Sequence, residues 1–131
     1  MQPAKAVFVV PTTDLAASIR FYRDGLGLEL TEEWSDLGRG AILRAASAAE
    51  VELIEVEELA DPPEPRTTLG LQVGEDEVDA IYSRLEQAGA RLKAPPRARE
   101  WGMRGFGAFD PSGVPINVYA PTLDTATDDE R

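Results

Sequence analysis

The chain has 131 residues, 43% of them hydrophobic, which is enough for one ordinary domain with a buried core. Its formal net charge of -11 disfavours nucleic acid and anionic membrane surfaces as partners, because both are bound through clusters of Lys and Arg, and it favours a cationic ligand. Cysteine and histidine are both absent, so disulfides, thiolate catalysis, zinc–thiolate sites and imidazole ligands are excluded. We expect a cytoplasmic protein without a signal peptide or membrane span, since no long apolar run follows a basic leader.

The first half of the chain predicts one helix among four strands. Residues 6–10 form a short apolar strand, and "TTDLAASIRFYRDGLGL" then changes to a helical period, with Leu15, Ile19 and Tyr22 on one stripe and Thr13 or Asp14 as the cap. Further strands are predicted at 28–34, 41–45 and 51–56. The proline-rich, acidic "EELADPPEPR" predicts an exposed, stiff connector, and acidic runs such as this one also suit solvated segments that serve solubility alone.

The second half repeats this order. A strand at 67–73 precedes the helix "DEVDAIYSRLEQAGA", and strands follow near Leu92, at 103–109 and at 114–119. The sequence Asp110-Pro111-Ser112-Gly113 has the residues that a type I turn favours, so the last two strands are predicted to form a hairpin. Pro115 cannot donate a hydrogen bond within a sheet, and its place is at an edge, near the strand start or over a bulge.

A shift of 62 residues aligns landmarks of the two halves. It superimposes Asp14 on Asp76, Ile19 on Ile81, Gly27 on Gly89 and Leu30 on Leu92. Two copies of this length indicate duplicated βαβββ modules packed together. We therefore predict a single α+β domain over residues 1–131, with module one at about 5–57, a linker at about 58–66, module two at about 67–121 and an acidic flexible tail at about 122–131.

Two stretches resemble a known superfamily. "TTDLAASIRFYRDGLGLEL" is similar to the first-half signature of the vicinal oxygen chelate superfamily, which includes glyoxalase I, extradiol dioxygenases and proteins of fosfomycin and bleomycin resistance. "WGMRGFGAFDPSGVPINVYAP" resembles its closing signature, and the resemblance covers roughly residues 6–121. It implies two βαβββ modules that form a curled mixed sheet around a cleft, usually in a homodimer. It does not name a substrate, because fold does not fix function.

In the metal enzymes of this superfamily, four ligands stand on strands that face the cleft. The resemblance places the first, commonly a His, at Val7, or at Phe8 if the register slips, and the third at Thr68 or Leu69. The ligand of the closing strand, usually Glu, falls on Asn117. Only the strand that ends the first half offers carboxylates, Glu52 and Glu55, and one of them is too few for a tight divalent ion. We expect no metal, no other cofactor and no metal-dependent catalysis.

The resemblance then favours the metal-free branch, whose members bind a drug in the same groove without turning it over. Three interpretations remain open: a small-molecule binding protein, which could sequester a cationic aromatic antibiotic; a lyase, isomerase or oxygenase of the same superfamily with an atypical site; and a regulatory or structural dimer with a vestigial cleft. No catalytic residue is assigned, because no paired acid and base stands at motif spacing, although the sequence alone does not exclude catalysis by a carboxylate base.

Seven residues are candidates for contact with the ligand. Flat rings bury much area at little entropic cost, so the two tryptophans are expected to stack on the ligand, unless they pack in the core or a dimer interface. Phe8 and Tyr119 stand on the predicted opening and closing strands, where packing in the core is the main alternative to ligand contact. The polar candidates have alternatives as well. Arg104 can form a surface ion pair, Glu55 can point into solvent, and Asn117 can hydrogen-bond to neighbouring backbone. The seven are Trp34, Trp101, Phe8, Tyr119, Arg104, Glu55 and Asn117.

Overall fold

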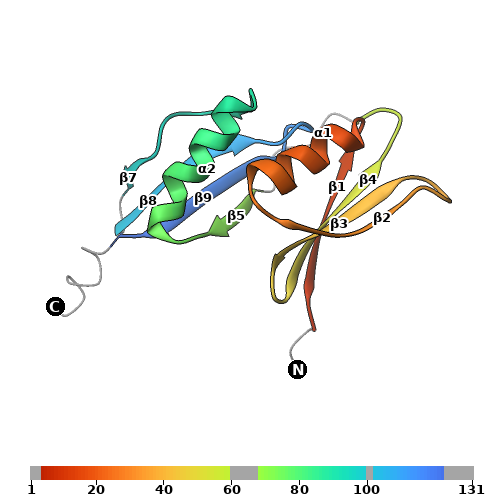
Figure 1. Ribbon diagram of the computed structural model, residues 1–131, viewed down its shortest axis with the longest axis horizontal. Coiled ribbons are helices and arrows are strands. Elements are labelled where there is room, and N and C mark those ends of the chain that lie inside the picture. The colour runs from red at the N-terminus through yellow and green to blue at the C-terminus, as the bar shows by residue number, and fades with distance from the viewer. Residues whose placement is uncertain (1–3, 60–67, 100–101, 123–131) are drawn as a thin grey trace.

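The computed structural model describes residues 4–59, 68–99 and 102–122, which form two mixed sheets and two helical segments (Figure 1). The first sheet has the strand order β1 (Ala6–Thr12), β4 (Ala49–Glu55), β3 (Gly40–Ala46) and β2 (Glu29–Trp34). The second has the order β5 (Leu69–Gln72), β9 (Pro115–Pro121), β8 (Met103–Phe109) and β6 (Arg91–Leu92), and β7 (Arg97–Arg99) also pairs with β8. The first sheet with its helix is a βαβββ module, and the second has the same order with the additional short strand β7. The predicted α+β class is confirmed.

The two sheets are separate and do not join into one curled sheet. The opening strands β1 and β5 are parallel to β4 and β9 respectively, and each leaves its other edge unpaired among the described residues. The remaining pairs of the described strands are antiparallel. Among the described residues both sheets are open at both edges, at β1 and β2 in the first and at β5 and the short strands β6 and β7 in the second. Natural proteins usually cover or pair such edges.

The first helical segment begins where the sequence predicts it. Asp14 caps α1 (Leu15–Ile19) by accepting a hydrogen bond from the backbone N–H of Ala17 at 3.0 Å. The helix then widens into a π-helical segment, η1 (Arg20–Gly25), which ends before Gly27 at a φ of 86°. Its counterpart in the second module, α2 (Glu75–Gln87), is followed by Gly89 at a φ of 80°. The two glycines aligned by the repeat thus serve the same helix exit.

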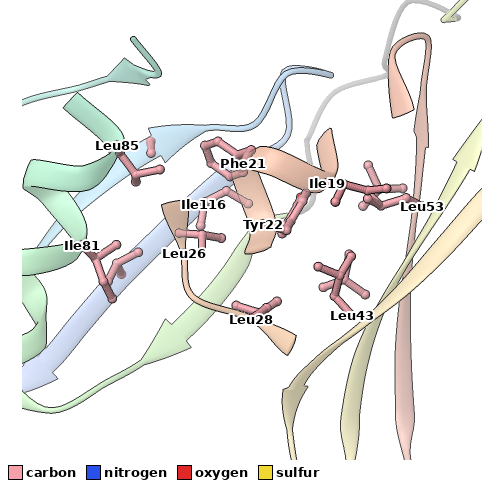
Figure 2. Close-up of a cluster of buried hydrophobic side chains, with 14 of the residues drawn as sticks. Ile19, Phe21, Tyr22, Leu26, Leu28, Leu43, Leu53, Ile81, Leu85 and Ile116 are labelled. Carbon is pink, nitrogen blue, oxygen red and sulfur yellow. The ribbon is translucent and has the colours of Figure 1, made fainter. Parts of the chain in front are cut away.

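One hydrophobic core joins both modules. Figure 2 shows Phe21 and Tyr22 of η1 between the first-module side chains Leu43 and Leu53 and the second-module side chain Leu85. Because α1 and η1 supply side chains to both modules, the helix-covered faces of the two sheets share this core. None of the helices in the described segments is long and apolar enough to cross a membrane.

A buried hydrogen bond also links the modules across 88 residues of sequence. The hydroxyl of Tyr22, 0% exposed, donates to Oδ2 of Asp110, 3% exposed, over 2.7 Å. Oδ1 of Asp110 accepts the backbone N–H groups of Ser112 and Val114, both at 2.8 Å, which fixes the predicted Asp-Pro-x-Gly turn. Burial raises the pKa of Asp110, and burial together with the charge of Asp110 raises the pKa of Tyr22, so the phenol remains the proton donor.

The structure adds detail to several predicted elements. Pro115 is the first residue of β9, as its missing N–H requires. Between the strands predicted near Leu92 and at 103–109, where the sequence predicts no element, the structure has the short strand β7. Most of the predicted linker, nearly all of the predicted tail and Trp101 lie outside the described residues.

Replacement of Tyr22 by Phe is expected to lower the free energy of unfolding by about 1–3 kcal/mol, because it leaves a buried carboxylate oxygen without its donor. Urea denaturation at neutral pH measures this change. Tyr82→Phe is the matched control, since the Tyr82 ring packs on Phe106 while its hydroxyl forms no hydrogen bond among the described residues. Equal stability of the two variants would contradict the role given to the bond.

Candidate functional site

Each sheet has one face covered by helix and one face free of it. Side chains alternate along a strand, so the buried positions identify the covered face and the positions between them the helix-free face. On β1 and β4 the helix-free positions include Val7, Val9 and Glu52; Val7 and Val9 are 43% and 57% exposed. On β9 they include Asn117 and Tyr119, which lie between the buried Ile116, Val118 and Ala120. We call these two surfaces the helix-free faces.

Asn117 lies between two glycines, and the side chain of Lys93 lies over one of them, with its Cδ 3.0 Å from where a Cβ of Gly107 would be. The neighbours of Asn117 in the ladder are Gly70 of β5 on one side and Gly107 of β8 on the other, so no side chain stands directly beside it on these strands. Its amide forms no hydrogen bond within the part of the chain that the structure describes, although the side chain is half-buried. The amide therefore keeps both donor and acceptor capacity for a bound molecule.

Tyr119 stands next to Asn117 on the same face. Its ring leans toward Gly70, with Cε1 3.7 Å from where a Cβ of that glycine would be. Its partner in β8 is Gly105, where any Cβ would collide with the carbonyl of Val118 and with Tyr119 itself. Tyr119 is half-buried and does not belong to the hydrophobic core, so its ring is available beside the amide. Tyr119 is thus not a core residue, which was the alternative to ligand contact at this position.

Trp34 lies on the helix-free face of the first sheet. It pairs with Gly40 in the β2–β3 ladder, and a Cβ on Gly40 would collide with the indole ring. The ring therefore covers bare backbone at the edge of the sheet and remains partly exposed. Such a position suits a flat surface on which an aromatic ligand stacks.

The structure distinguishes the two candidate carboxylates. Glu55 belongs to the helix-covered side: its Oε2 accepts the N–H of Leu15 at 3.2 Å, and its Oε1 pairs with Arg39 at 3.1 Å. Glu52 lies on the helix-free face, where it pairs across the strands with Val9 and Ile42, and it forms no ion pair among the described residues. The alternation of buried Val51 and Leu53 was the sequence signal that separates the two glutamates.

Two further candidates point toward the helices. Phe8 pairs with the buried Val51 and packs against the core, which agrees with the core alternative given for it. Arg104 forms a two-pronged ion pair with Asp79 of α2 at 2.9 and 3.0 Å, which raises the pKa of its guanidinium and agrees with the ion-pair alternative. The side chains brought onto the helix-free faces are thus Trp34, Glu52, Asn117 and Tyr119.

The donor set does not fit a divalent metal. The positions that the resemblance gives to metal ligands hold the hydrocarbon side chain of Val7, one carboxylate, and the neutral oxygens of Thr68 and Asn117. Leu69, the other choice for the third ligand, packs against the core. Across residues 4–59, 68–99 and 102–122, no three His, Cys, Asp or Glu side chains gather closely enough to hold an ion.

The comparisons with known proteins agree on the fold. The family model described as Glyoxalase/Bleomycin resistance protein/Dioxygenase superfamily matches residues 6–118. No curated protein matches the chain in sequence.

Several solved structures are similar to the chain. A glyoxalase/bleomycin resistance protein/dioxygenase from Nocardioides is 24% identical, with a TM-score of 0.68 over 94% of this chain and 86% of that one. The fosfomycin resistance protein FosX from Listeria monocytogenes is 19% identical, with a TM-score of 0.74 over 95% and 98% of the two chains. TioX from Micromonospora sp. ML1 is 18% identical, with a TM-score of 0.71 over 90% and 98%. At these identities the likeness concerns the fold alone.

Purified protein is expected to carry well below one zinc, nickel, iron or manganese ion per chain, because the donors above are too few and mostly uncharged. Elemental analysis checks this. The double variant Val7→His, Asn117→Glu changes one residue on each sheet. It should raise nickel affinity by about tenfold to a hundredfold, in competition with a coloured chelator, when a second copy of the chain brings the two faces together.

Leu37→His with Asn117→Glu is the control, since Leu37 is fully exposed on a loop. About one ion per wild-type chain, removable with loss of an activity, would contradict the prediction, as would equal gains in both double variants.

Proposed function

Because the chain belongs to the glyoxalase/bleomycin resistance protein/dioxygenase superfamily, we propose that it is a metal-free protein that binds a small molecule against its helix-free faces. The observation that carries this proposal is Asn117, a free amide between two glycines at the position where the resemblance calls for an anionic ligand. An amide orients a ligand through hydrogen bonds but does not replace a charged metal ligand. The role proposed is therefore binding of the ligand, without turnover at a metal.

The ligand that suits these faces is cationic and partly aromatic. Trp34 and Tyr119 offer rings beside bare backbone, and Glu52 offers a carboxylate without an ion-pair partner among the described residues. The net charge of -11 favours the approach of a cation. Sequestration of an antibiotic fits this chemistry, the family description, which includes bleomycin resistance proteins, and the similarity to a fosfomycin resistance protein. A cytoplasmic location is part of the same proposal.

The proposal includes a homodimer. Both sheets share their helix-covered sides in one core, so a cleft between two helix-free faces requires a second copy of the chain. The unpaired edge of β1, with the exposed Val7 and Val9, supports this arrangement, because an open apolar edge favours pairing with another chain. In the dimer, the first module of one chain would meet the second module of its partner.

Titration with bleomycin-like glycopeptides and mitomycin-like quinones is expected to give saturable quenching of tryptophan emission at one ligand per chain, with a rise in melting temperature and recovery of unchanged compound. Trp34→Ala should weaken binding about tenfold to a hundredfold if the ring is a buried anchor. Trp101→Ala, at a residue outside the described ones, is tested in parallel. Neutral aromatics of similar size should bind more weakly, and rising salt should reduce the difference.

Leu37→Ala is the matched control for the loss of apolar surface, because Leu37 is close to Trp34 in sequence and fully exposed. It should leave the affinity unchanged. Chemically altered compound after many turnovers would make the protein an enzyme, and the absence of a response to any compound would favour a vestigial cleft.

Light scattering at micromolar concentration is expected to give the mass of a dimer. Val9→Lys should shift the mass toward the monomer and weaken the ligand titration, because it places a charge on the exposed edge strand. Lys5→Gln, at an exposed residue just before the same strand, is the control. A stable wild-type monomer that still binds ligand would place the groove within one chain and contradict the dimer.

A further inference from the structure

A pocket of about 460 Å³ lies where the two modules meet, away from Trp34, Glu52, Asn117 and Tyr119. Its walls come from α1 and η1, from the end of α2 with the segment that follows it, and from the turn after β8. The volume suits a small organic molecule.

Three arginines line this pocket in an otherwise acidic chain. Arg20, Arg84 and Arg91 form no ion pair with any described carboxylate. Arg84 is held in place, because its Nε donates to the carbonyl of Gly25 at 3.2 Å. Arg91 lies over the ring of Phe109, 4.2 Å from its centre. A guanidinium that is already positioned loses less freedom when it binds a ligand.

The negative groups of the pocket are already engaged. Asp24 forms an ion pair with Arg23 at 2.8 Å, and both oxygens of Asp110 accept hydrogen bonds from Tyr22 and the following turn. The carbonyls at the end of α2 are also occupied, by the N–H groups of Ala88, Gly89 and Ala90. Arg84 and Arg91 therefore have no charged partner among the described lining residues. Arg20 forms no ion pair, although after Arg23 its charge also helps to lower the pKa of Asp24.

The pocket also has an apolar wall. Phe21 and Leu85 belong to the buried core and line the pocket from the two modules, and Phe109 adds an aromatic ring at the end of β8. Guanidinium groups beside aromatic and aliphatic side chains suit a molecule with an anionic head and an apolar body.

We propose that this pocket binds a small amphipathic organic anion, with a carboxylate, sulfonate or phosphate head near Arg20, Arg84 and Arg91 and a flat apolar body against Phe21 and Phe109. This site differs in place and in ligand charge from the helix-free faces, so its existence does not depend on the function proposed for them. Because the pocket lies where the two modules meet, a ligand in it contacts both halves of the chain.

The probe is 8-anilinonaphthalene-1-sulfonate, which becomes fluorescent in apolar surroundings, and N-phenyl-1-naphthylamine serves as its uncharged counterpart. We expect saturable binding of the sulfonate at one molecule per chain and weaker binding of the amine. Arg20→Gln and Arg91→Gln should each weaken sulfonate binding about threefold to tenfold. A loss of this size lies between the loss expected for an exposed ion pair and the loss expected for a charge-assisted hydrogen bond. Neither change should alter binding of the amine.

Both arginines are exposed, so these variants should keep the wild-type melting temperature. Arg99→Gln, on the exposed strand β7 and outside the pocket, is the charge-matched control. Ala17→Leu adds volume to the pocket wall and should reduce binding of both probes.

Amide chemical shifts locate the site. On addition of the sulfonate, changes are expected at residues 17–25, 84–91 and 109–111, and Trp34→Ala or Asn117→Ala should leave the affinity unchanged. Shifts centred on the helix-free faces, or equal affinity of the Arg20, Arg91 and Arg99 variants, would overturn the proposal. Failure of the antibiotic titration would leave these results unaffected.

Discussion

The hydrogen bond between Tyr22 and Asp110 is the constraint on which the arrangement of the two modules depends. Its two side chains are buried and come from η1 and from the turn between β8 and β9. The same carboxylate accepts the N–H of Val114, the residue before β9 begins, so it fixes the register with which β9 enters the sheet. A slip of one residue would turn Asn117 into the helix-covered face. The position of the candidate site therefore follows from a bond about seven residues away.

The helix-free faces combine open backbone with a few polar and aromatic groups. Asn117 lies between Gly70 and Gly107, the second of which is covered by the side chain of Lys93. Gly40 makes space for the ring of Trp34. These glycines weaken the strands in which they lie, since they contribute no side chain to the ladder. The hydrogen bonds of the buried Asp110 and the shared core supply the order that these strands lack.

The sequence predicted the strands, the helices and the Asp-Pro-x-Gly turn because each depends on local periodicity and turn chemistry. The repeat was equally readable, since Gly27 and Gly89 both need a positive φ. Three features depend on contacts distant in sequence and were not predicted: the separation of the two sheets, the pairing of β7 with β8, and the arginines around the pocket.

For the site, Arg104 forms the ion pair and Phe8 has the core contact that were the alternatives for them. The sequence leaves open which of Glu52 and Glu55 faces away from the helices, and the structure places Glu52 there because Glu55 shares the helix-covered face with Val51 and Leu53.

The net charge describes the chain as a whole and does not describe its separate surfaces. Glu52 leaves the first helix-free face with an unpaired carboxylate, whereas three unpaired arginines line the pocket at the module boundary. At physiological salt, exposed charges more than about 8 Å apart act nearly independently, so the two surfaces can attract ligands of opposite charge. They are joined mechanically, however, because Asp110 lines the pocket and also fixes the strand that carries Asn117. Any molecule that displaced the Asp110 turn would therefore also disturb the amide on the other face.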